Sequence, residues 1–241
     1  MAGLYIHIPF CAKRCSYCGF YSTTRLNMQD KYVDSICKEM LLRRNYLSSP
    51  SQDDNTSGII NTVYIGGGTP SQLTRFNLDK IFNSIAKNFS CSLEEVTIEV
   101  NPDDVTPELA SALSELSVNR VSMGAQTFDD NRLKFLNRRH KSYQVDNAID
   151  VLHNQGIENI SIDLMFGFPD QTLDSWLEDI RHAIMLDVQH ISAYSLMYED
   201  GTPLYKMLKE GKIHEIDENL SLSMYNKLSD MMDDAGYEHY E

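Results

Sequence analysis

Short runs of strand-like sequence recur along the chain at intervals of about 30 residues, which is the size of one βα unit. Within these runs apolar residues tend to fall at every second position, the period of a β-strand, and between them the apolar period changes to that of a helix. The sequence therefore predicts six strands, at residues 4–8, 62–65, 95–100, 120–125, 159–165 and 190–196.

The intervening segments carry apolar stripes at helical spacing. These stripes predict helices over residues 33–41, 78–89, 106–116, 172–184 and 220–231. Thr106 and Thr172 are expected N-caps, and Pro107 then occupies the first helical position, where proline is tolerated. Gly236 is expected to end the last helix as its C′ residue.

Strands that alternate with helices imply an α/β fold with a parallel sheet and right-handed crossovers. Six units are too few for a closed eight-stranded barrel, so we expect a partial (β/α)6 barrel, a TIM-like parallel sheet with outer helices. A doubly wound open sheet is the alternative. In either arrangement, ligands are expected at the carboxyl ends of the strands.

Composition narrows the range of partners. The chain has 241 residues, of which 42% are hydrophobic, which suits one large domain. Its net charge of -14 repels phosphate backbones, so we expect no nucleic-acid partner.

No apolar stretch approaches the length of a membrane span, and the N-terminus does not resemble a signal peptide. Five cysteines, three of them bunched, do not suggest a secreted disulfide framework, so we expect a cytoplasmic protein, with an organelle matrix as the alternative.

The stretch CAKRCSYCGFYS places Cys11, Cys15 and Cys18 directly after the first predicted strand. Thiolates this close together need a cation or a cluster to offset their charge. Three thiolates can hold three corners of a cubane iron–sulfur cluster and leave the fourth iron open to a small molecule. A zinc site completed by a distant His or Cys, or unligated thiols, are the alternatives. Cys37 and Cys91 are expected to be core or near-surface thiols rather than metal ligands.

Further candidate residues follow the other strands. The stretch YIGGGTPS ends the second strand in three glycines, which allow a ligand to approach the backbone closely. Glu99, Gln126 and Asp163 lie at or near the ends of the third, fourth and fifth strands. A carboxylate such as Glu99 between apolar neighbours is either partnered in a salt bridge or functional.

The C-x3-C-x2-C spacing, with Tyr17 before the third cysteine, resembles the radical S-adenosylmethionine (radical SAM) superfamily. The resemblance implies a [4Fe–4S] cluster whose open iron is chelated by the amino and carboxylate groups of S-adenosylmethionine. It further implies that an electron from the cluster can cleave this cofactor to methionine and a 5′-deoxyadenosyl radical.

Motifs along almost the whole chain are similar to the family of oxygen-independent coproporphyrinogen III oxidases and HemW-type heme chaperones. They are LYIHIPFC, YCGFYS, GGGTPS, EVNPDD, SMGAQTF, LNRRH, DLMFGFP and EDGTPLYKMLKEGK. By this resemblance, the cluster-bound cofactor is contacted by Tyr5, Gly67, Gly68, Thr69 and Glu99. Positions that contact a second cofactor molecule in the oxidase branch are matched by Gln126, Arg138 and Asp163.

Two departures favour the heme-chaperone branch of this family. Phe20 stands where the oxidases have a fourth cysteine, and only ten residues precede Cys11, whereas the oxidases have a long N-terminal segment. The resemblance then implies that the protein binds heme or porphyrin and passes heme to an acceptor protein, with a flavodoxin- or ferredoxin-like reductant. An oxygen-independent coproporphyrinogen III oxidase and a non-catalytic structural metal-binding module are the alternatives.

The domain organisation follows from the same resemblance. Residues 1–241 are expected to form one radical SAM core, with a polar surface insertion at 48–58. The family continues into a C-terminal domain, so the chain is expected to be a fragment. Among the histidines, His140 is the most suggestive heme ligand, because Arg138 and Arg139 precede it and could face propionates.

Overall fold

The computed structural model describes residues 2–47 and 58–240, so all but the last residue of the expected insertion lies outside the described residues. All six predicted strands are present and pair in parallel. They are β1 (Ala2–Ile8), β2 (Ile59–Gly67), β3 (Ser90–Val100), β4 (Arg120–Gln126), β5 (Asn159–Phe166) and β6 (His190–Ser195).

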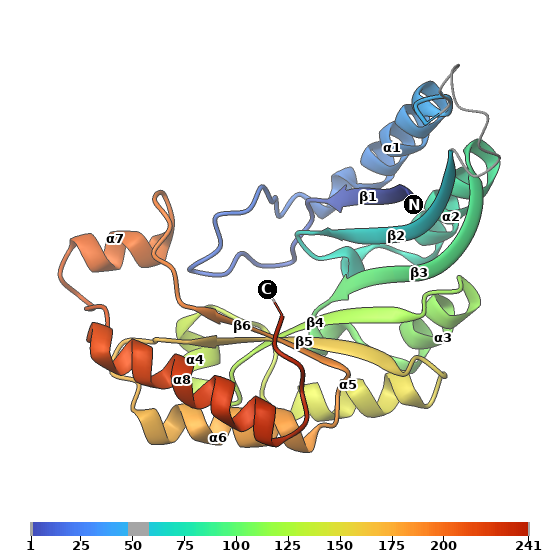
Figure 1. The fold of residues 1–241 in the computed structure, drawn as a ribbon. Coiled ribbons are helices and arrows are strands. Elements are labelled where there is room, and N and C mark those ends of the chain that lie inside the picture. Colours follow the sequence, from blue (N-terminus) through green and yellow to red (C-terminus); the bar gives the residue numbers. More distant parts are fainter. Residues whose placement is uncertain (1, 48–57, 241) are drawn as a thin grey trace.

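The strand order decides between the two expected architectures. Neighbouring strands follow the chain order from β1 to β6 without a reversal. In a doubly wound sheet the order reverses at a switch point and helices cover both faces, whereas sequential order with crossovers of one hand leaves the helices on one face. Figure 1 shows the sheet curving with the helices outside it. The predicted partial barrel is confirmed, and the doubly wound alternative is wrong.

The helices follow the strands along the chain. They are α1 (Gln29–Arg43), α2 (Arg75–Asn88), α3 (Pro107–Glu115), α4 (Asp130–Phe135), α5 (Tyr143–His153), α6 (Leu173–Met185), α7 (Pro203–Lys209) and α8 (Glu218–Asp234). The Thr106 hydroxyl accepts from the Leu109 N–H, and Thr172 caps α6 in the same way. Gly236 adopts a φ of 84°, as expected for a C′ glycine.

Three helices were not predicted as separate elements. With 6 and 7 residues, α4 and α7 are too short to show a helical period. The 11 residues of α5 do bury a stripe, formed by Val145, Ala148, Ile149 and Leu152, which the sequence analysis passed over. Cys91 lies within β3, because this strand begins at Ser90, well before its predicted start.

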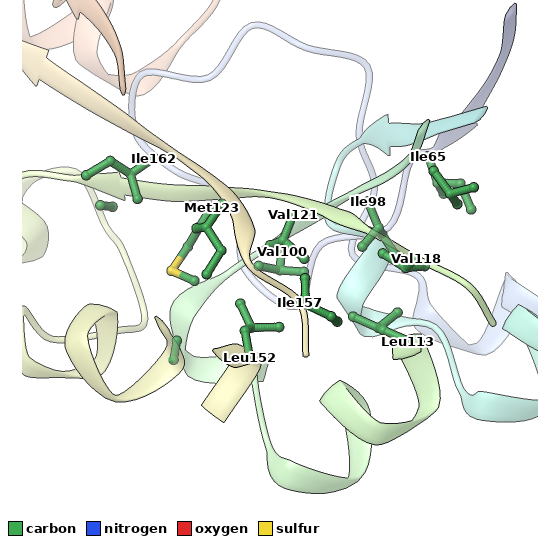
Figure 2. Close-up of a cluster of buried hydrophobic side chains, with 14 of the residues drawn as sticks. Ile65, Ile98, Val100, Leu113, Val118, Val121, Met123, Leu152, Ile157 and Ile162 are labelled. Carbon is green, nitrogen blue, oxygen red and sulfur yellow. The ribbon is translucent and has the colours of Figure 1, made fainter. Parts of the chain in front are cut away.

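The two faces of the sheet differ in character. Side chains on the outer face are apolar and pack against the helices; Figure 2 shows Ile98, Val121 and Met123 of the sheet beside Leu113 of α3 and Leu152 of α5. Successive side chains point to opposite faces, so the intervening positions line the inner face. These positions are largely polar and include Tyr5, Tyr64, Thr97, Glu99, Ser122, Ser161, Asp163 and Ser192. The polar inner face is therefore the side on which a ligand can bind.

Candidate functional site

The cysteine-bearing loop leaves the carboxyl end of β1 and is fixed at both its base and its tip. At the base, the Cys11 N–H donates to the Thr23 carbonyl over 3.0 Å. Near the tip, the Ser16 N–H donates to the Leu136 carbonyl, and the Ser16 carbonyl accepts from the Leu204 N–H, both over 2.9 Å. The loop, blue in Figure 1, thus extends from β1 toward the end of α4 and the first turn of α7.

The three cysteines of this loop share one electrostatic environment. Cys11, Cys15 and Cys18 are free and partly buried. Burial raises the pKa of the Cys18 thiol, and the nearby Cys15 and Cys11 sulfurs act in the same direction. The Thr69 hydroxyl donates to the Cys11 sulfur over 3.5 Å. Any bound cation or cluster that offsets the thiolate charge is therefore favoured here.

The arrangement of these thiols bears on the kind of metal group that fits. Within residues 2–47 and 58–240, no three His, Cys, Asp or Glu side chains converge closely enough to hold a single metal ion. A structural zinc ion usually takes four protein ligands. In a cubane cluster each thiolate binds a different iron. The three thiols of this loop fit such a cluster, with the fourth iron left open.

Arg138 connects the cysteine loop to two strands. Its Nη1 donates to the Cys15 sulfur over 3.6 Å. Its Nη2 donates to the Asn101 side-chain carbonyl over 2.8 Å and to the Gly124 carbonyl over 2.6 Å. Arg138 thus places a fixed positive charge in contact with a sulfur that a cluster would use as a ligand.

The glycine stretch at the end of β2 lies against the same loop. Gly67 has a φ of 121°, and a Cβ there would lie 2.5 Å from the His7 ring. A Cβ on Gly68 would lie 3.0 Å from the Cys11 sulfur and 2.8 Å from the backbone of Pro9. Glycine is therefore required at both positions by close contact with the segment that carries the first cysteine.

Replacing Gly68 by alanine is expected to lower iron loading and to destabilise the protein by about 1–3 kcal/mol, because backbone atoms would have to move. Iron content and urea unfolding check this expectation. Gly19→Ala, on the cysteine loop, is the matched control, since its Cβ would meet only Glu199 side-chain atoms at 3.4 Å or more. Equal iron loading and stability of the two variants would contradict the expectation.

Glu99 lies on the inner face beside this glycine stretch. Its carboxylate accepts from the Tyr64 hydroxyl over 2.8 Å and from the Gly67 N–H over 2.9 Å. Burial and the Glu99 charge both raise the pKa of Tyr64, so this tyrosine stays a hydrogen-bond donor. The Tyr5 ring stacks on Tyr64 with 5.9 Å between centroids, and Tyr5 is 57% exposed. A carboxylate with two bonds retains lone pairs for a cationic ligand.

Asp163 lies farther along the inner face, opposite Ser192 of β6. Burial raises the pKa of Asp163 to about 6, and the charge of Glu99 contributes in the same direction. Gln126, at the end of β4, is 7% exposed and adopts a left-handed φ of 71° after an irregularity in the β4–β5 pairing. Such a conformation is costly for a non-glycine residue and is often found at functional sites.

Replacing Asp163 by asparagine is expected to change the pH dependence of stability. Because the folded-state pKa is raised, the native state binds this proton more tightly than the unfolded state, so stability is lost as the pH rises from about 4 to about 6. The variant should therefore gain up to about 3 kcal/mol relative to the wild type between pH 4 and pH 7. Urea unfolding across this range measures the gain, with exposed Asp150→Asn on α5 as control. A constant difference between Asp163→Asn and the wild type would contradict this expectation.

The structure brings the predicted residues together on one side of the sheet, through contacts that join Thr69 to Cys11, Glu99 to Gly67, and Arg138 to Cys15. Two contributing residues were not predicted. Tyr64 could have been found from its position on the same strand face as the glycines. Asn101 could not, because its contact with Arg138 spans 37 residues of sequence.

The suggestion that His140 binds heme does not fit the structure. His140 is 3% exposed, and its Nε2 lies 3.1 Å from the Ala125 carbonyl. Burial and the nearby Arg138 charge lower the pKa of His140 to about 3, so the ring is neutral and donates this hydrogen bond. Arg139 pairs with Asp104 at 2.7 Å and so does not present a free charge to propionates. His140 is therefore not accessible as a heme ligand, and both arginines before it are engaged in contacts within the protein.

No helix in the part of the chain that the structure describes is both long and apolar enough to cross a bilayer.

Comparisons with known proteins agree with this geometry. The sequence model of the radical SAM superfamily matches residues 5–183. The heme chaperone HemW of Bacillus subtilis (strain 168) is 36% identical over 244 residues, which cover 100% of this chain and 62% of that protein. HemW of Lactococcus lactis subsp. lactis (strain IL1403) is 34% identical, with 98% and 60% covered. The chain thus spans about 60% of the length of these curated relatives.

Solved structures show the same fold. Coproporphyrinogen III oxidase (HemN) from Escherichia coli, described as a radical SAM enzyme, superposes with a TM-score of 0.86 at 23% identity, covering 98% of this chain and 53% of that one. The methyltransferase TsrM from Kitasatospora setae, solved with cobalamin and a [4Fe–4S] cluster bound, gives 0.60 at 14% identity, with 86% and 39% covered. From the matched family model, the three-cysteine loop and the partial barrel, we conclude that the chain belongs to the radical SAM superfamily, whose cofactors are a [4Fe–4S] cluster and S-adenosylmethionine.

Proposed function

We propose that residues 1–241 form the radical SAM core of a heme chaperone, which binds heme and transfers it to an acceptor protein. The observation that carries this proposal is the match, over 98% or more of the chain, to HemW heme chaperones from several bacteria at 33–36% identity. Phe20, which stands where the oxidases have a fourth cysteine, is 72% exposed and supports the same branch.

In this proposal Cys11, Cys15 and Cys18 hold the [4Fe–4S] cluster. The chemistry that this cluster supplies when bound is one-electron reduction of S-adenosylmethionine. The charged groups of the chain bind and orient the cofactor. The Glu99 carboxylate accepts a hydrogen bond from the ammonium group of S-adenosylmethionine. This carboxylate lies beside the glycine stretch, where it already accepts a hydrogen bond from the Gly67 N–H.

The remaining proposed contacts surround this position. Gly68 and Thr69 lie against Cys11 and offer backbone close to the cluster, and Tyr5 covers the open side. Gln126 and Asp163 lie farther along the inner face, where a second cofactor molecule or another ligand is proposed to bind, and Arg138 lies between them and the cysteine loop.

Exposed apolar side chains near the site suit a planar macrocycle. Phe20 and Tyr21 of the cysteine loop are 72% and 79% exposed, and Tyr194 and Met197, in and just after β6, are 54% and 58% exposed. The Tyr21 ring lies 6.2 Å from that of His7 on β1. Since β1 and β6 are the two edge strands of the sheet, the loop pair and the β6 pair are separate candidate contacts for such a ligand.

The proposed partners are a heme-acceptor protein and a flavodoxin- or ferredoxin-like reductant. We place the protein in the cytoplasm, because its five cysteines are free and a reducing compartment keeps thiols in that state.

A heme titration of the full-length protein under anaerobic conditions tests the proposal. We expect a saturable heme absorbance change and heme transfer to an apo-acceptor. The double variant Phe20→Ser/Tyr21→Ser should bind heme more weakly, whereas Tyr143→Ser on outer helix α5, 58% exposed, should bind normally. Absence of heme binding by the wild type would overturn the proposal.

A coproporphyrinogen III oxidase remains the second candidate, favoured by the fold similarity to HemN. It is tested in the same preparation by adding coproporphyrinogen and measuring carbon dioxide and 5′-deoxyadenosine. Turnover of this substrate would favour the oxidase, and heme binding without turnover favours the chaperone.

A further inference from the structure

Arg138 is a partly buried cation that forms no ion pair in the described part of the chain, although the charges of Asp103 and Asp163 act on it from farther away. Its recorded partners are the Cys15 sulfur, the Asn101 amide oxygen and the Gly124 carbonyl. Its Nε is buried and has no hydrogen-bond partner among the described residues. The adjacent Arg139, in contrast, forms ion pairs with two aspartates.

A buried guanidinium is stable only when an anion offsets its charge, because desolvation of an isolated charge is costly. The nearest candidate is the Cys15 sulfur at 3.6 Å, on the loop that carries all three clustered cysteines. A cluster held by three thiolates supplies negative charge at this place. The neutral partners fix the direction of the guanidinium, and the cluster would supply negative charge in direct contact with it, nearer than the charges of Asp103 and Asp163.

We propose that Arg138 is a positioning residue for the iron–sulfur cluster, which donates a hydrogen bond to the Cys15 sulfur and raises the reduction potential of the cluster. This assignment rests on the proposed function, because it requires the three cysteines to hold the cluster. One-electron reduction by a flavodoxin- or ferredoxin-like donor adds one negative charge to the cluster and oxidises the donor by one electron. A fixed positive charge and a hydrogen bond to a ligating sulfur stabilise the reduced state.

The surroundings of Arg138 hold its guanidinium in this direction. Asn101 follows β3 and Gly124 lies in β4, so two neighbouring strands accept from the same Nη2. A Cβ on Gly124 would lie 3.1 Å from that Nη2 and 2.7 Å from the Gln126 side-chain amide. The absence of a side chain at Gly124 therefore leaves room for the arginine beside the sheet.

The test compares midpoint potentials of anaerobically reconstituted full-length protein in the absence of S-adenosylmethionine, by reductive titration with dithionite followed by absorbance and electron paramagnetic resonance. Arg138→Gln is expected to shift the potential to more negative values. Arg138→Lys keeps the positive charge but loses the planar guanidinium with its paired N–H donors. The midpoint potential of this variant should therefore also move to more negative values, but by less than in Arg138→Gln. Arg139→Gln is the matched control and should keep the wild-type potential.

The outcomes separate this inference from the proposed function. A wild-type protein without iron and sulfide overturns both. A loaded Arg138→Gln protein with the wild-type potential overturns the inference alone, and weaker binding of S-adenosylmethionine by that variant would then assign Arg138 to the cofactor carboxylate. If Arg138→Gln does not retain the cluster, Arg138→Lys decides, because an unshifted potential in that loaded variant also overturns the inference.

Discussion

Simultaneous replacement of Cys11, Cys15 and Cys18 by alanine is expected to reduce iron and sulfide from about four of each per chain to almost none. These three thiols lie on one anchored loop and are electrostatically coupled. Cys37 and Cys91 provide matched controls: Cys37 packs against the core on α1, and Cys91 is exposed on β3. Alanine at either control position should leave cluster content unchanged. Iron and sulfide assays after anaerobic reconstitution, with the absorbance band of the cluster, provide the measurement.

The same series separates a cluster from the alternatives. A single zinc per chain without labile sulfide would show that the thiols serve a structural metal. Loss of cluster from the Cys37 or Cys91 variant would show that a fourth protein thiol takes part in ligation. Either result would remove the open iron at which S-adenosylmethionine is proposed to bind.

Glu99→Gln is expected to weaken binding of S-adenosylmethionine by about 10- to 100-fold, because a charge-assisted hydrogen bond to the ammonium group is replaced by a neutral one. The substitution keeps the shape of the side chain, and its amide oxygen can still accept from the Gly67 N–H. The amide NH2 then replaces the oxygen that accepts from Tyr64, and the Tyr64 hydroxyl can turn to accept from it. Equilibrium dialysis against the reconstituted protein measures the affinity.

Glu95→Gln is the matched control for this substitution. Glu95 lies on the same strand four residues earlier, with its side chain on the same face, and pairs with Arg120 at 3.5 Å rather than with the glycine stretch. Its replacement should leave the affinity for S-adenosylmethionine unchanged. Equal weakening by both variants would indicate a general effect of charge on the inner face, and no weakening by Glu99→Gln would remove Glu99 from the cofactor site.

Local sequence was sufficient for the strands and most of the longer helices. Strand alternation and helical stripes depend on neighbouring residues alone, so β4 to β6 were placed to within one residue at each end. The short helices α4 and α7 were not found, because a single helical turn or two carries too little periodicity. The alternation of apolar and polar residues along the strands implied one polar face of the sheet. Whether that face can bind a ligand depended on which face the helices cover.

The candidate site was predictable only in part. The three cysteines, the glycine stretch and Glu99 could be identified because each follows a strand within a recognisable motif. His140 was misread, because a basic run in sequence does not show which of its side chains are buried. Arg138 and Cys15 are 123 residues apart in the sequence, so no local pattern predicts the hydrogen bond between them.

Local patterns in the sequence were enough to predict a parallel α/β sheet and a three-cysteine loop of radical SAM type. Both predictions rest on hydrophobic periodicity and motif spacing, which depend only on residues close together in the sequence. The folded structure was needed to exclude the doubly wound alternative and to place Arg138 against Cys15. Both depend on strand order and on contacts between distant segments, which are fixed when the apolar outer face packs against its helices.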